Sequence, residues 1–266
     1  MVWTKGDGPG KRHNILMLHG WGGTNLSLAP LKEALGPAFN AITPDFPGYG
    51  ENHSGPGPYT FERYRAFIRE TVLKEGPDSF HLLGWSMGGA VAASYCLEGI
   101  TPQPRSLILL DATPRFVCPE KNLGIGQHPA AVMKLERMIR ENPETGLEDF
   151  ISRIFKAGEE IPEENRTMIE RHLKGVPFPP GKQALVESLK ELARADLLAY
   201  EKRLGLPVLI IYGAIDKITP SGGQRLWTCL FENITEAPVS SAGHAPHLTR
   251  TGEVAGLVTD FLDSLE

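Results

Sequence analysis

The sequence predicts an α/β protein with a mostly parallel central sheet, flanking helices and an inserted helical cap. The first observation is that short apolar runs of strand length alternate with helical patterns, which is typical of a parallel sheet covered on both faces. The second is that this alternation stops after Asp111 and resumes only near residue 195. We therefore expect one discontinuous core domain, residues 1–111 and 195–266, and a helical cap over residues 112–194.

Composition and charge argue against several classes of protein, among them nucleic-acid-binding, membrane and secreted proteins. Of the 266 residues 41% are hydrophobic, and the net charge of −5 does not favour nucleic acid or an anionic membrane as a partner. No apolar run approaches the ~18 residues of a membrane span, and residues 1–12 lack the apolar stretch of a signal peptide. The three cysteines show no C-x-x-C spacing, which predicts reduced thiols. We expect a cytoplasmic monomer or weak homodimer.

In the first part of the chain, compact apolar runs predict strands and apolar residues at helical spacing predict helices. Thr60 is a suitable N-cap for the longest of these helices, and its apolar side chains fall on one face. The predicted strands cover residues 2–4, 14–18, 39–43, 80–83 and 106–110. The predicted helices cover residues 28–35, 61–74 and the stretch that ends at Leu97.

The second part begins with four helical patterns separated by proline and glycine, and then returns to alternation. The four patterns cover residues 130–140, 146–156, 163–174 and 182–194. After them we expect strands at 208–212 and 234–239 and helices at 221–230 and 251–265, with a loop at 241–246.

The turn at Ser86 is the strongest local signal. A strand leads into Gly84-Trp85-Ser86-Met87-Gly88 and a helical pattern of small residues follows directly. A serine at the tip of so sharp a turn has a strained backbone, and side chains two residues to either side would collide, which explains both glycines. The pattern predicts a nucleophilic serine; the alternative is a simple helix cap.

A serine hydroxyl needs a base to remove its proton, and that base needs a carboxylate to orient it. Asp216 and His244 each follow a predicted strand, and the carboxyl ends of parallel strands share one edge of a sheet. The sequence therefore predicts Ser86, Asp216 and His244 as a catalytic triad. His247 is the main alternative base, and Asp111 is the alternative acid.

An oxyanion that forms on the substrate needs N–H donors already directed at it. The backbone N–H of Met87, next after the nucleophile, is one candidate. Trp21 follows His19-Gly20 in a glycine-rich loop, and its backbone N–H is the second. The alternative is a plain turn that carries a surface tryptophan. Asp45, after another predicted strand, is expected to anchor its own loop.

Five motifs together resemble the α/β-hydrolase superfamily, whose members carry nucleophile, acid and histidine in this chain order. They are His19-Gly20-Trp21-Gly22, Asp45-x-Pro47-Gly48-x-Gly50, Gly84-Trp85-Ser86-Met87-Gly88-Gly89, Tyr212-Gly213-x-x-Asp216 and Gly243-His244-Ala245-Pro246. Within the superfamily, the chain looks most like the carboxylesterases of biotin synthesis, which hydrolyse the methyl ester of pimeloyl-acyl-carrier protein. The features behind this narrower resemblance are Trp3-Thr4-Lys5-Gly6, the tryptophans at 21 and 85, the His244-Ala245-Pro246 turn and the length of the cap.

The resemblance implies roles for individual residues. Ser86, Asp216 and His244 would form the triad, Trp21 and Met87 would line the oxyanion site and contact substrate, and a phenylalanine of the cap would contact the pimeloyl chain. That phenylalanine corresponds to Phe150. Members of the family engage the acidic carrier protein through cap arginines, but Asp149 stands where one is expected. The cations that could substitute are Arg153, Lys156, Arg166, Arg171 and Lys174.

We expect a serine carboxylester hydrolase that forms an acyl-serine intermediate and uses neither a metal nor an organic cofactor. Its partner would be a small ester, free or carried on acyl-carrier protein. Short-chain carboxylesterases, hydrolases of carbon–carbon bonds and perhydrolases share the scaffold and remain alternatives. Haloalkane dehalogenases are disfavoured because they need a carboxylate at the position of Ser86. A non-catalytic binding protein with the same fold is the alternative from another class.

Overall fold

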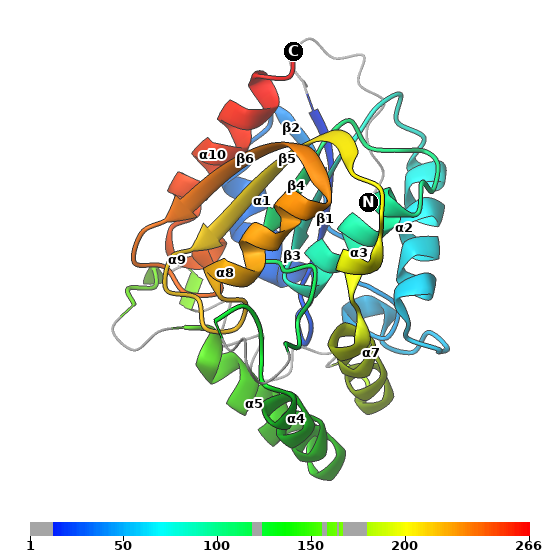
Figure 1. Cartoon of the computed structure of the whole chain (residues 1–266), viewed down its shortest axis with the longest axis vertical. Coiled ribbons are helices and arrows are strands. Elements are labelled where there is room, and N and C mark those ends of the chain that lie inside the picture. Colours follow the sequence, from blue (N-terminus) through cyan, green and yellow to red (C-terminus); the bar gives the residue numbers. More distant parts are fainter. Residues whose placement is uncertain (1–12, 119–123, 156–158, 164, 167–179) are drawn as a thin grey trace.

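The computed structural model describes residues 13–118, 124–155, 159–163, 165–166 and 180–266. Within these residues, six parallel strands form one sheet in the order β2-β1-β3-β4-β5-β6 (Figure 1). The strands are β1 His13–Leu18, β2 Phe39–Ile42, β3 His81–Trp85, β4 Leu107–Leu110, β5 Leu204–Gly213 and β6 Phe231–Val239. The predicted α/β class is confirmed. The predicted strand at residues 2–4 lies outside the described residues.

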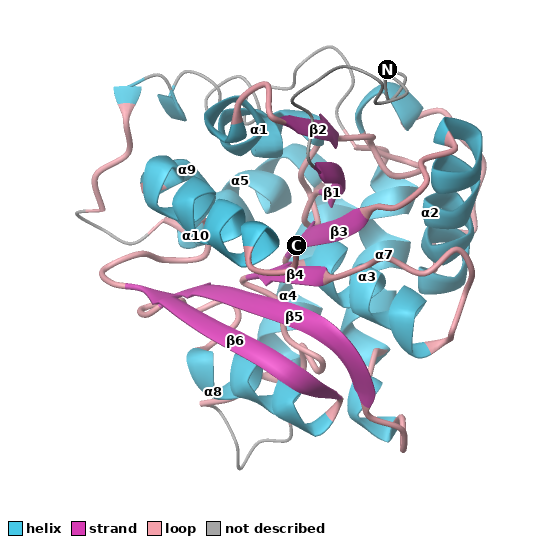
Figure 2. Cartoon of the chain, turned by 90° about the horizontal axis from the view of Figure 1, so that it is seen from above, coloured by secondary structure: helices cyan, strands magenta, loops and turns pink. Residues whose placement is uncertain are grey.

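Helices cover both faces of the sheet, because strands linked by parallel crossovers need helices above and below them. Figure 2 shows α1 and α10 on one side of the sheet and α2 and α3 on the other. These helices are α1 Ala29–Leu35, α2 Phe61–Glu75, α3 Met87–Leu97 and α10 Thr251–Asp263. The residues of β3 and β4 are all buried, as expected for central strands between two helical layers.

Helix α2 begins and ends as its sequence predicts. The hydroxyl of Thr60 accepts a hydrogen bond of 3.2 Å from the backbone N–H of Arg63, so the predicted N-cap is confirmed. The helix stops at Gly76, whose left-handed φ of 59° favours glycine. Two of its own side chains, Tyr64 and Ile68, are fully buried.

The strand order reverses between β1 and β3, which are neighbours in the sheet although β2 lies between them in the sequence. The chain leaves β1 toward one edge of the sheet and leaves β3 toward the other. Such a switch point is where open α/β sheets bind ligands, at the carboxyl ends of the strands. The loops that begin at His19 and at Ser86 both start there.

In the described part of the inserted region (residues 112–194), helices are joined by loops and isolated bridges, and no strand is present. It contains α4 Pro129–Glu141, α5 Pro143–Ile154 and α7 Lys182–Arg194. In Figure 1 these helices lie below the sheet. The predicted helix over residues 163–174 falls mostly outside the described residues, and the predicted domain boundaries stay a prediction.

The two ends of the inserted region lie side by side. Arg115 forms an isolated antiparallel bridge and an ion pair with Asp196. The backbone N–H of Leu197 donates to the carbonyl of Pro114 at 2.9 Å. The chain therefore leaves the core after β4 and returns to it before β5 at almost the same point.

One helix predicted in the last part of the chain is wrong in its extent. The helix expected at 221–230 is only α8 Ser221–Gln224, followed by a 3₁₀ helix at Arg225–Cys229. The backbone of Gly223 packs so tightly on the carbonyl of Ile125 that no side chain fits there, so the position of this segment is set by tertiary contact. The loop expected at 241–246 is confirmed over residues 241–245, and a short helix, α9 Pro246–Thr249, begins at its last residue, a proline.

None of the described helices combines the length and the apolar character that crossing a membrane requires. Cys96 and Cys118 are buried and Cys229 is exposed, and all three are free thiols, as predicted.

Candidate active site

Ser86 occupies the strained turn that its flanking glycines predict. Its φ of 54° and ψ of −118° lie outside the regions that side chains other than glycine favour. A Cβ atom on Gly88 would lie 2.6 Å from the carbonyl oxygen of His19, and one on Gly84 would collide with the backbone of Gly88 and Gly89. The turn thus exists only because both positions lack side chains.

The structure brings together the three residues of the predicted triad from the ends of three strands. Ser86 follows β3, Asp216 follows β5 and His244 follows β6. The Oγ atom of Ser86 lies 2.9 Å from Nε2 of His244, and Nδ1 of His244 lies 2.8 Å from Oδ2 of Asp216. Both residues are buried, Ser86 with 7% of its surface exposed and His244 with 1%.

Asp216 is held in its charged form. Its Oδ1 accepts hydrogen bonds from the backbone N–H groups of Ile218 (2.7 Å) and Thr219 (3.1 Å), and its Oδ2 accepts one from the Thr219 hydroxyl (2.6 Å). Burial raises its pKa, but attraction to His244 and the hydrogen bonds from His244 and Thr219 outweigh burial and lower the pKa. A carboxylate only accepts, so Nδ1 of His244 carries the proton and Nε2 is left to accept the proton of Ser86.

Asp111, the alternative acid, lies beside the triad in a different state. Its ligand oxygen, that of Asp216 and a nitrogen of His244 lie within 4.8 Å of one another, close enough to share a metal ion in principle. Oδ1 of Asp111 accepts from the backbone N–H of Gly213 at 2.9 Å, while Oδ2 has no partner among the described residues. Complete burial and the charge of Asp216 raise its pKa well above the usual value. Burial and the charge of Asp216 thus favour the neutral form of Asp111 beside the hydrogen-bonded Asp216–His244 pair.

His247, the alternative base, is fully buried and stacks edge-on against Trp85, with ring centroids 4.8 Å apart. Burial and the nearby His244 lower its pKa to about 3. It stays neutral near pH 7 in a wall of the site, and the imidazole that contacts Ser86 is that of His244.

The loop with Trp21 presses against the serine. A Cβ on Gly20 would lie 3.2 Å from the Cβ of Ser86, so the backbone passes the nucleophile closely. His19 fixes this loop, since its Nδ1 contacts the carbonyl of Gly20 at 2.8 Å and its Nε2 accepts from the backbone N–H of Phe46 at 3.0 Å. Burial lowers the pKa of His19 against the opposing effect of Asp45, so the ring is neutral and can accept that bond.

Met87 is the first residue of α3, and the first N–H groups of a helix have no partner within it. The backbone N–H groups of Met87 and Trp21 therefore belong to the two segments that meet at Ser86, the start of α3 and the Trp21 loop. Their role as oxyanion donors stays a prediction.

Phe150 lies on α5 and meets Trp21 edge-on, with ring centroids 4.9 Å apart. The indole N–H of Trp21 donates to the carbonyl of Leu185 on α7 at 3.0 Å. Helices α5 and α7 of the inserted region thus both contact Trp21. A small cavity of about 20 Å³ lies beside Phe150. Its other lining residues are Phe116, Gln127, Ala131, Val132, Leu135, Arg153 and Ile218.

The cations considered for a carrier protein are paired where they are described. Arg153 forms an ion pair with Asp149 one helical turn away, and Arg166 pairs with Glu163 at 3.1 Å. Lys156, Arg171 and Lys174 lie outside the described residues.

Three contributors to the site escaped the sequence analysis. They are the Thr219 hydroxyl on Asp216, the His19 imidazole in the Trp21 loop and the Trp85 indole, which donates to the carbonyl of His244 at 2.8 Å. Only Thr219 had a local signal, because an aspartate side chain often accepts hydrogen bonds from backbone N–H groups two or three residues later, which brings Thr219 close to Asp216.

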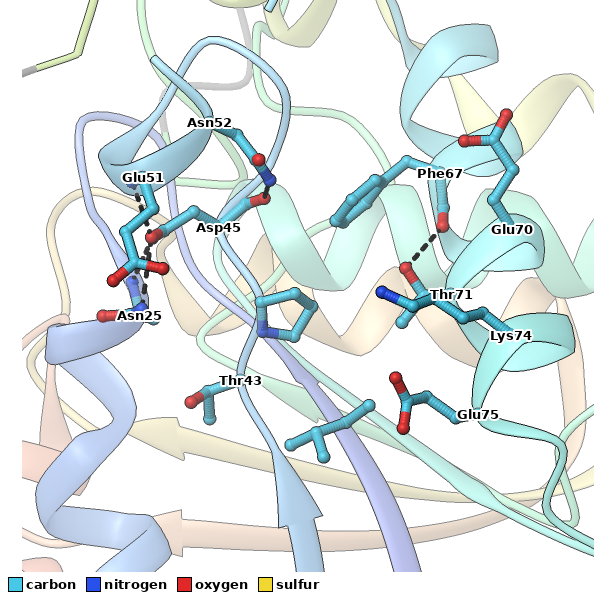
Figure 3. Close-up of a pocket in the computed structure, with 12 residues that line it drawn as sticks. Asn25, Thr43, Asp45, Glu51, Asn52, Phe67, Glu70, Thr71, Lys74 and Glu75 are labelled. Carbon is cyan, nitrogen blue, oxygen red and sulfur yellow. Dashed lines mark hydrogen bonds between the residues drawn. The ribbon is translucent and has the colours of Figure 1, made fainter. Parts of the chain in front are cut away.

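A larger cavity of about 430 Å³ lies elsewhere, between β2 and α2 (Figure 3). None of the triad residues lines it. Asp45 forms one wall and accepts hydrogen bonds from the backbone N–H groups of Asn25 (2.6 Å) and Glu51 (3.0 Å). These bonds confirm that Asp45 anchors its loop.

Comparison with known proteins agrees with the geometry. Residues 15–257 match the profile described as alpha/beta hydrolase family. The chain belongs to this family. The pimeloyl-[acyl-carrier protein] methyl ester esterase of Serratia marcescens is 30% identical over 259 residues, which cover 96% of this chain and 95% of the relative. The protein of the same name from Salmonella typhi is 28% identical over 248 residues, 93% of each chain.

Solved structures share the fold of this hydrolase. An esterase from Exiguobacterium antarcticum has a TM-score of 0.85 at 21% identity and covers 96% of this chain and 93% of its own. MenH from S. aureus has a TM-score of 0.79 at 21% identity, and the match covers 98% of this chain and 97% of that one. At these identities the likeness shows the fold alone.

Proposed function

We propose that this hydrolase cleaves carboxylic esters through an acyl-serine intermediate. The observation that carries the proposal is the relay from Ser86 Oγ through His244 to the charged Asp216, with contacts of 2.9 and 2.8 Å. A serine hydroxyl within hydrogen-bond distance of an oriented imidazole is the arrangement that activates it as a nucleophile.

The steps follow from the positions of the groups. His244 Nε2 takes the proton of Ser86 while Oγ attacks the ester carbonyl, and the N–H groups of Met87 and Trp21 stabilise the oxyanion. The tetrahedral intermediate expels the alcohol, which takes the proton from His244 and leaves an acyl-serine. Water then gives a proton to His244 as its oxygen attacks the acyl group. When the second tetrahedral intermediate collapses, the carboxylic acid leaves and His244 returns the proton to Ser86 Oγ. Asp216 stabilises the imidazolium in both steps.

Removal of Ser86 and His244 tests this chemistry. Hydrolysis of p-nitrophenyl butyrate should fall by about 10⁶-fold in Ser86→Ala or His244→Ala, and the double variant should lose little more, because the two act as a unit. A fluorophosphonate should label Ser86 in the wild type. Absence of both hydrolysis and labelling in folded protein would show a binding protein without catalysis.

For the natural substrate we propose the methyl ester of a pimeloyl group on acyl-carrier protein. The supporting facts are the two relatives of that name and the apolar contact of Trp21 with Phe150. The carrier would have to compete for cations that already have acidic partners, as Arg153 has in Asp149. A free small ester is the alternative within the same chemistry.

Two measurements separate these substrates. The gene should restore growth without biotin to a strain that lacks its own esterase, whereas the Ser86→Ala variant should not. A panel of methyl esters, free and carrier-bound, should show the highest kcat/KM for the carrier-bound pimeloyl ester. Failure of complementation by soluble protein, together with equal rates on free esters, would exclude the carrier-bound substrate.

A further inference from the structure

We infer that Glu159, which belongs to the inserted region, is a positioning residue for His244 and holds the loop that carries this histidine. This inference rests on the proposed function of Ser86 and His244. It assigns to the inserted region a part in the relay itself, in addition to covering the site.

A single carboxylate oxygen connects the two sides of the histidine loop. Oε1 of Glu159 accepts a hydrogen bond from the backbone N–H of Gly243 at 3.0 Å and another from the hydroxyl of Thr249 at 2.7 Å. Gly243 immediately precedes His244, and Thr249 ends α9, which begins two residues after the histidine. Glu159 thus bridges the residues on either side of the imidazole, and such charge-assisted bonds are stronger than neutral ones.

Neighbouring residues of the inserted region contact the same loop. The backbone N–H of His244 donates to the carbonyl of Ile154 at the end of α5, at 3.1 Å. The side-chain amide of Asn165, which is 3% exposed, donates to the carbonyl of Leu248 at 2.6 Å and to the hydroxyl of Thr251 at 3.0 Å. The inserted region therefore contacts the loop before, at and after the histidine.

The opposite side of the loop rests on the end of β5. The carbonyls of Ala242 and Gly243 press on Gly213 so closely that no side chain fits at that position. With β5 on one side and Glu159 on the other, the loop cannot move away from the sheet. Without the Glu159 acceptor, Gly243 has no side chain to restrict its backbone, and Ser241 two residues earlier already has a left-handed φ of 59°.

A small loss of order at this loop has a large effect on catalysis. His244 Nε2 must stay within hydrogen-bond distance of Ser86, and a displacement of about 1 Å in a catalytic group can cost about 10²-fold in rate. We therefore expect removal of the Glu159 carboxylate to lower kcat, while groups that bind the substrate keep KM nearly constant.

The experiment compares Glu159→Ala, Glu159→Gln and the control Glu160→Ala in the full chain. The adjacent Glu160 is exposed, and only its backbone carbonyl is bonded to the loop, by Arg250 at 3.3 Å. With p-nitrophenyl butyrate, kcat should fall about 10- to 100-fold in Glu159→Ala with KM within about threefold. Glu159→Gln retains an acceptor oxygen and should stay within about threefold of the wild type, as should the control.

One further readout does not depend on turnover, and a second does not depend on the variants of Glu159. The proton between His244 and Asp216 should give a far-downfield ¹H NMR signal that Glu159→Ala broadens and Glu159→Gln retains. Thr249→Val, which removes one of the two donors, should lower kcat less than Glu159→Ala does, and it tests the same contact if Glu159→Ala does not fold.

Equal kcat in Glu159→Ala, Thr249→Val and wild type would overturn the inference, as would an equal loss in Glu159→Ala and Glu159→Gln. An unchanged NMR signal in folded Glu159→Ala would overturn it as well. If the wild type neither hydrolyses esters nor reacts with a fluorophosphonate, the proposed function fails instead, and the NMR signal still decides whether Glu159 holds the histidine.

Discussion

Asp216 and Asp111 are two buried carboxyl groups whose oxygens lie within 4.8 Å of each other. Two such groups do not both ionise at low cost, because like charges in a poorly solvated site repel. Hydrogen bonds decide which one is charged. Asp216 receives bonds from Ile218, Thr219 and His244, whereas the carboxyl of Asp111 accepts a backbone hydrogen bond from Gly213, and its Oδ2 has no hydrogen-bond partner among the described residues. The charge therefore lies on the residue that contacts the histidine.

This difference predicts that the same substitution has a large effect at Asp216 and a small effect at Asp111. Asp216→Asn should lower kcat by about 10⁴-fold, because an amide no longer fixes the tautomer in which Nε2 of His244 accepts. Asp111→Asn replaces a neutral acid by a neutral amide that can still accept from Gly213, so kcat should stay within about threefold of the wild type. Ester hydrolysis and thermal unfolding of both variants check this. A larger loss in Asp111→Asn, with folding intact, would assign the acid role to Asp111.

At the scale of single residues, local sequence was enough to predict that Ser86, Asp216 and His244 lie together, since each stands in a recognisable turn after a strand; their catalytic role stays a prediction. Local sequence was not enough to find the contact of His19 with the Trp21 loop or the contact of Glu159 with the histidine loop. His19 bonds to Phe46, which is 27 residues away, and Glu159 bonds to Gly243, which is 84 residues away. Such partners depend on how separate elements approach one another, and a single sequence carries no local trace of that.

At the scale of elements, the junction of β3 and α3 is the most constrained part of the fold. The backbone of Gly88 lies against the carbonyls of Leu18 and His19 at the end of β1. Helix α3 can approach the sheet this closely only without a side chain at that position. The contact determines both where the helix begins and where Ser86 is presented.

Two Gly→Ala variants separate this constraint from the general effect of glycine in helices. Gly88→Ala should lower the free energy of unfolding by about 1–3 kcal/mol or more, because the methyl group has no room. Gly256→Ala in α10 meets nothing within 4 Å and should raise it by about 0.5–1 kcal/mol, because alanine favours helix. Urea unfolding measures both. Equal effects in the two helices would contradict the steric account.

Where element predictions failed, tertiary contacts had replaced local preference. The segment 221–230 has apolar residues at helical spacing, yet only its first turn is α-helical, and at that turn Gly223 is pressed against the loop at Ile125. Strand β6 is longer than predicted and begins at Phe231. As the edge strand of the described sheet, it carries glutamates that hide its β pattern.

At the scale of the whole molecule, buried histidines make stability depend on pH. His81 is 2% exposed, with Nδ1 2.8 Å from the hydroxyl of Ser106 and Nε2 3.3 Å from Nδ1 of His13. Burial, with the nearby His13 and Arg105, lowers its pKa to about 4. The unfolded chain, with an ordinary histidine pKa of about 6.5, binds more protons than the folded one between these two values.

The free energy of unfolding should therefore be highest above pH 6.5 and fall as the pH is lowered toward 4. A His81→Gln variant cannot titrate at this position, so its stability should fall less steeply across the same range. Urea titrations of both proteins between pH 4 and 7.5 measure the two slopes. Identical slopes would show that His81 is not among the groups responsible.

The whole-molecule order of strands illustrates what a single sequence cannot show. Alternating strands and helices were sufficient to predict a parallel sheet, since no other arrangement buries so many short apolar runs. The order β2-β1-β3-β4-β5-β6, by contrast, depends on which way each crossover turns. That choice, rather than any motif, brings the Trp21 loop next to Ser86.

The bridge between Arg115 and Asp196 has an evolutionary consequence. Because the inserted region leaves the core and returns to it at almost the same point, it can be lengthened, shortened or exchanged without altering the spacing of β4 and β5. Natural variation can therefore remodel what the enzyme selects while the bond-breaking groups stay in place. If Glu159 holds the histidine as inferred, each newly recruited segment must also bring a replacement for that single oxygen.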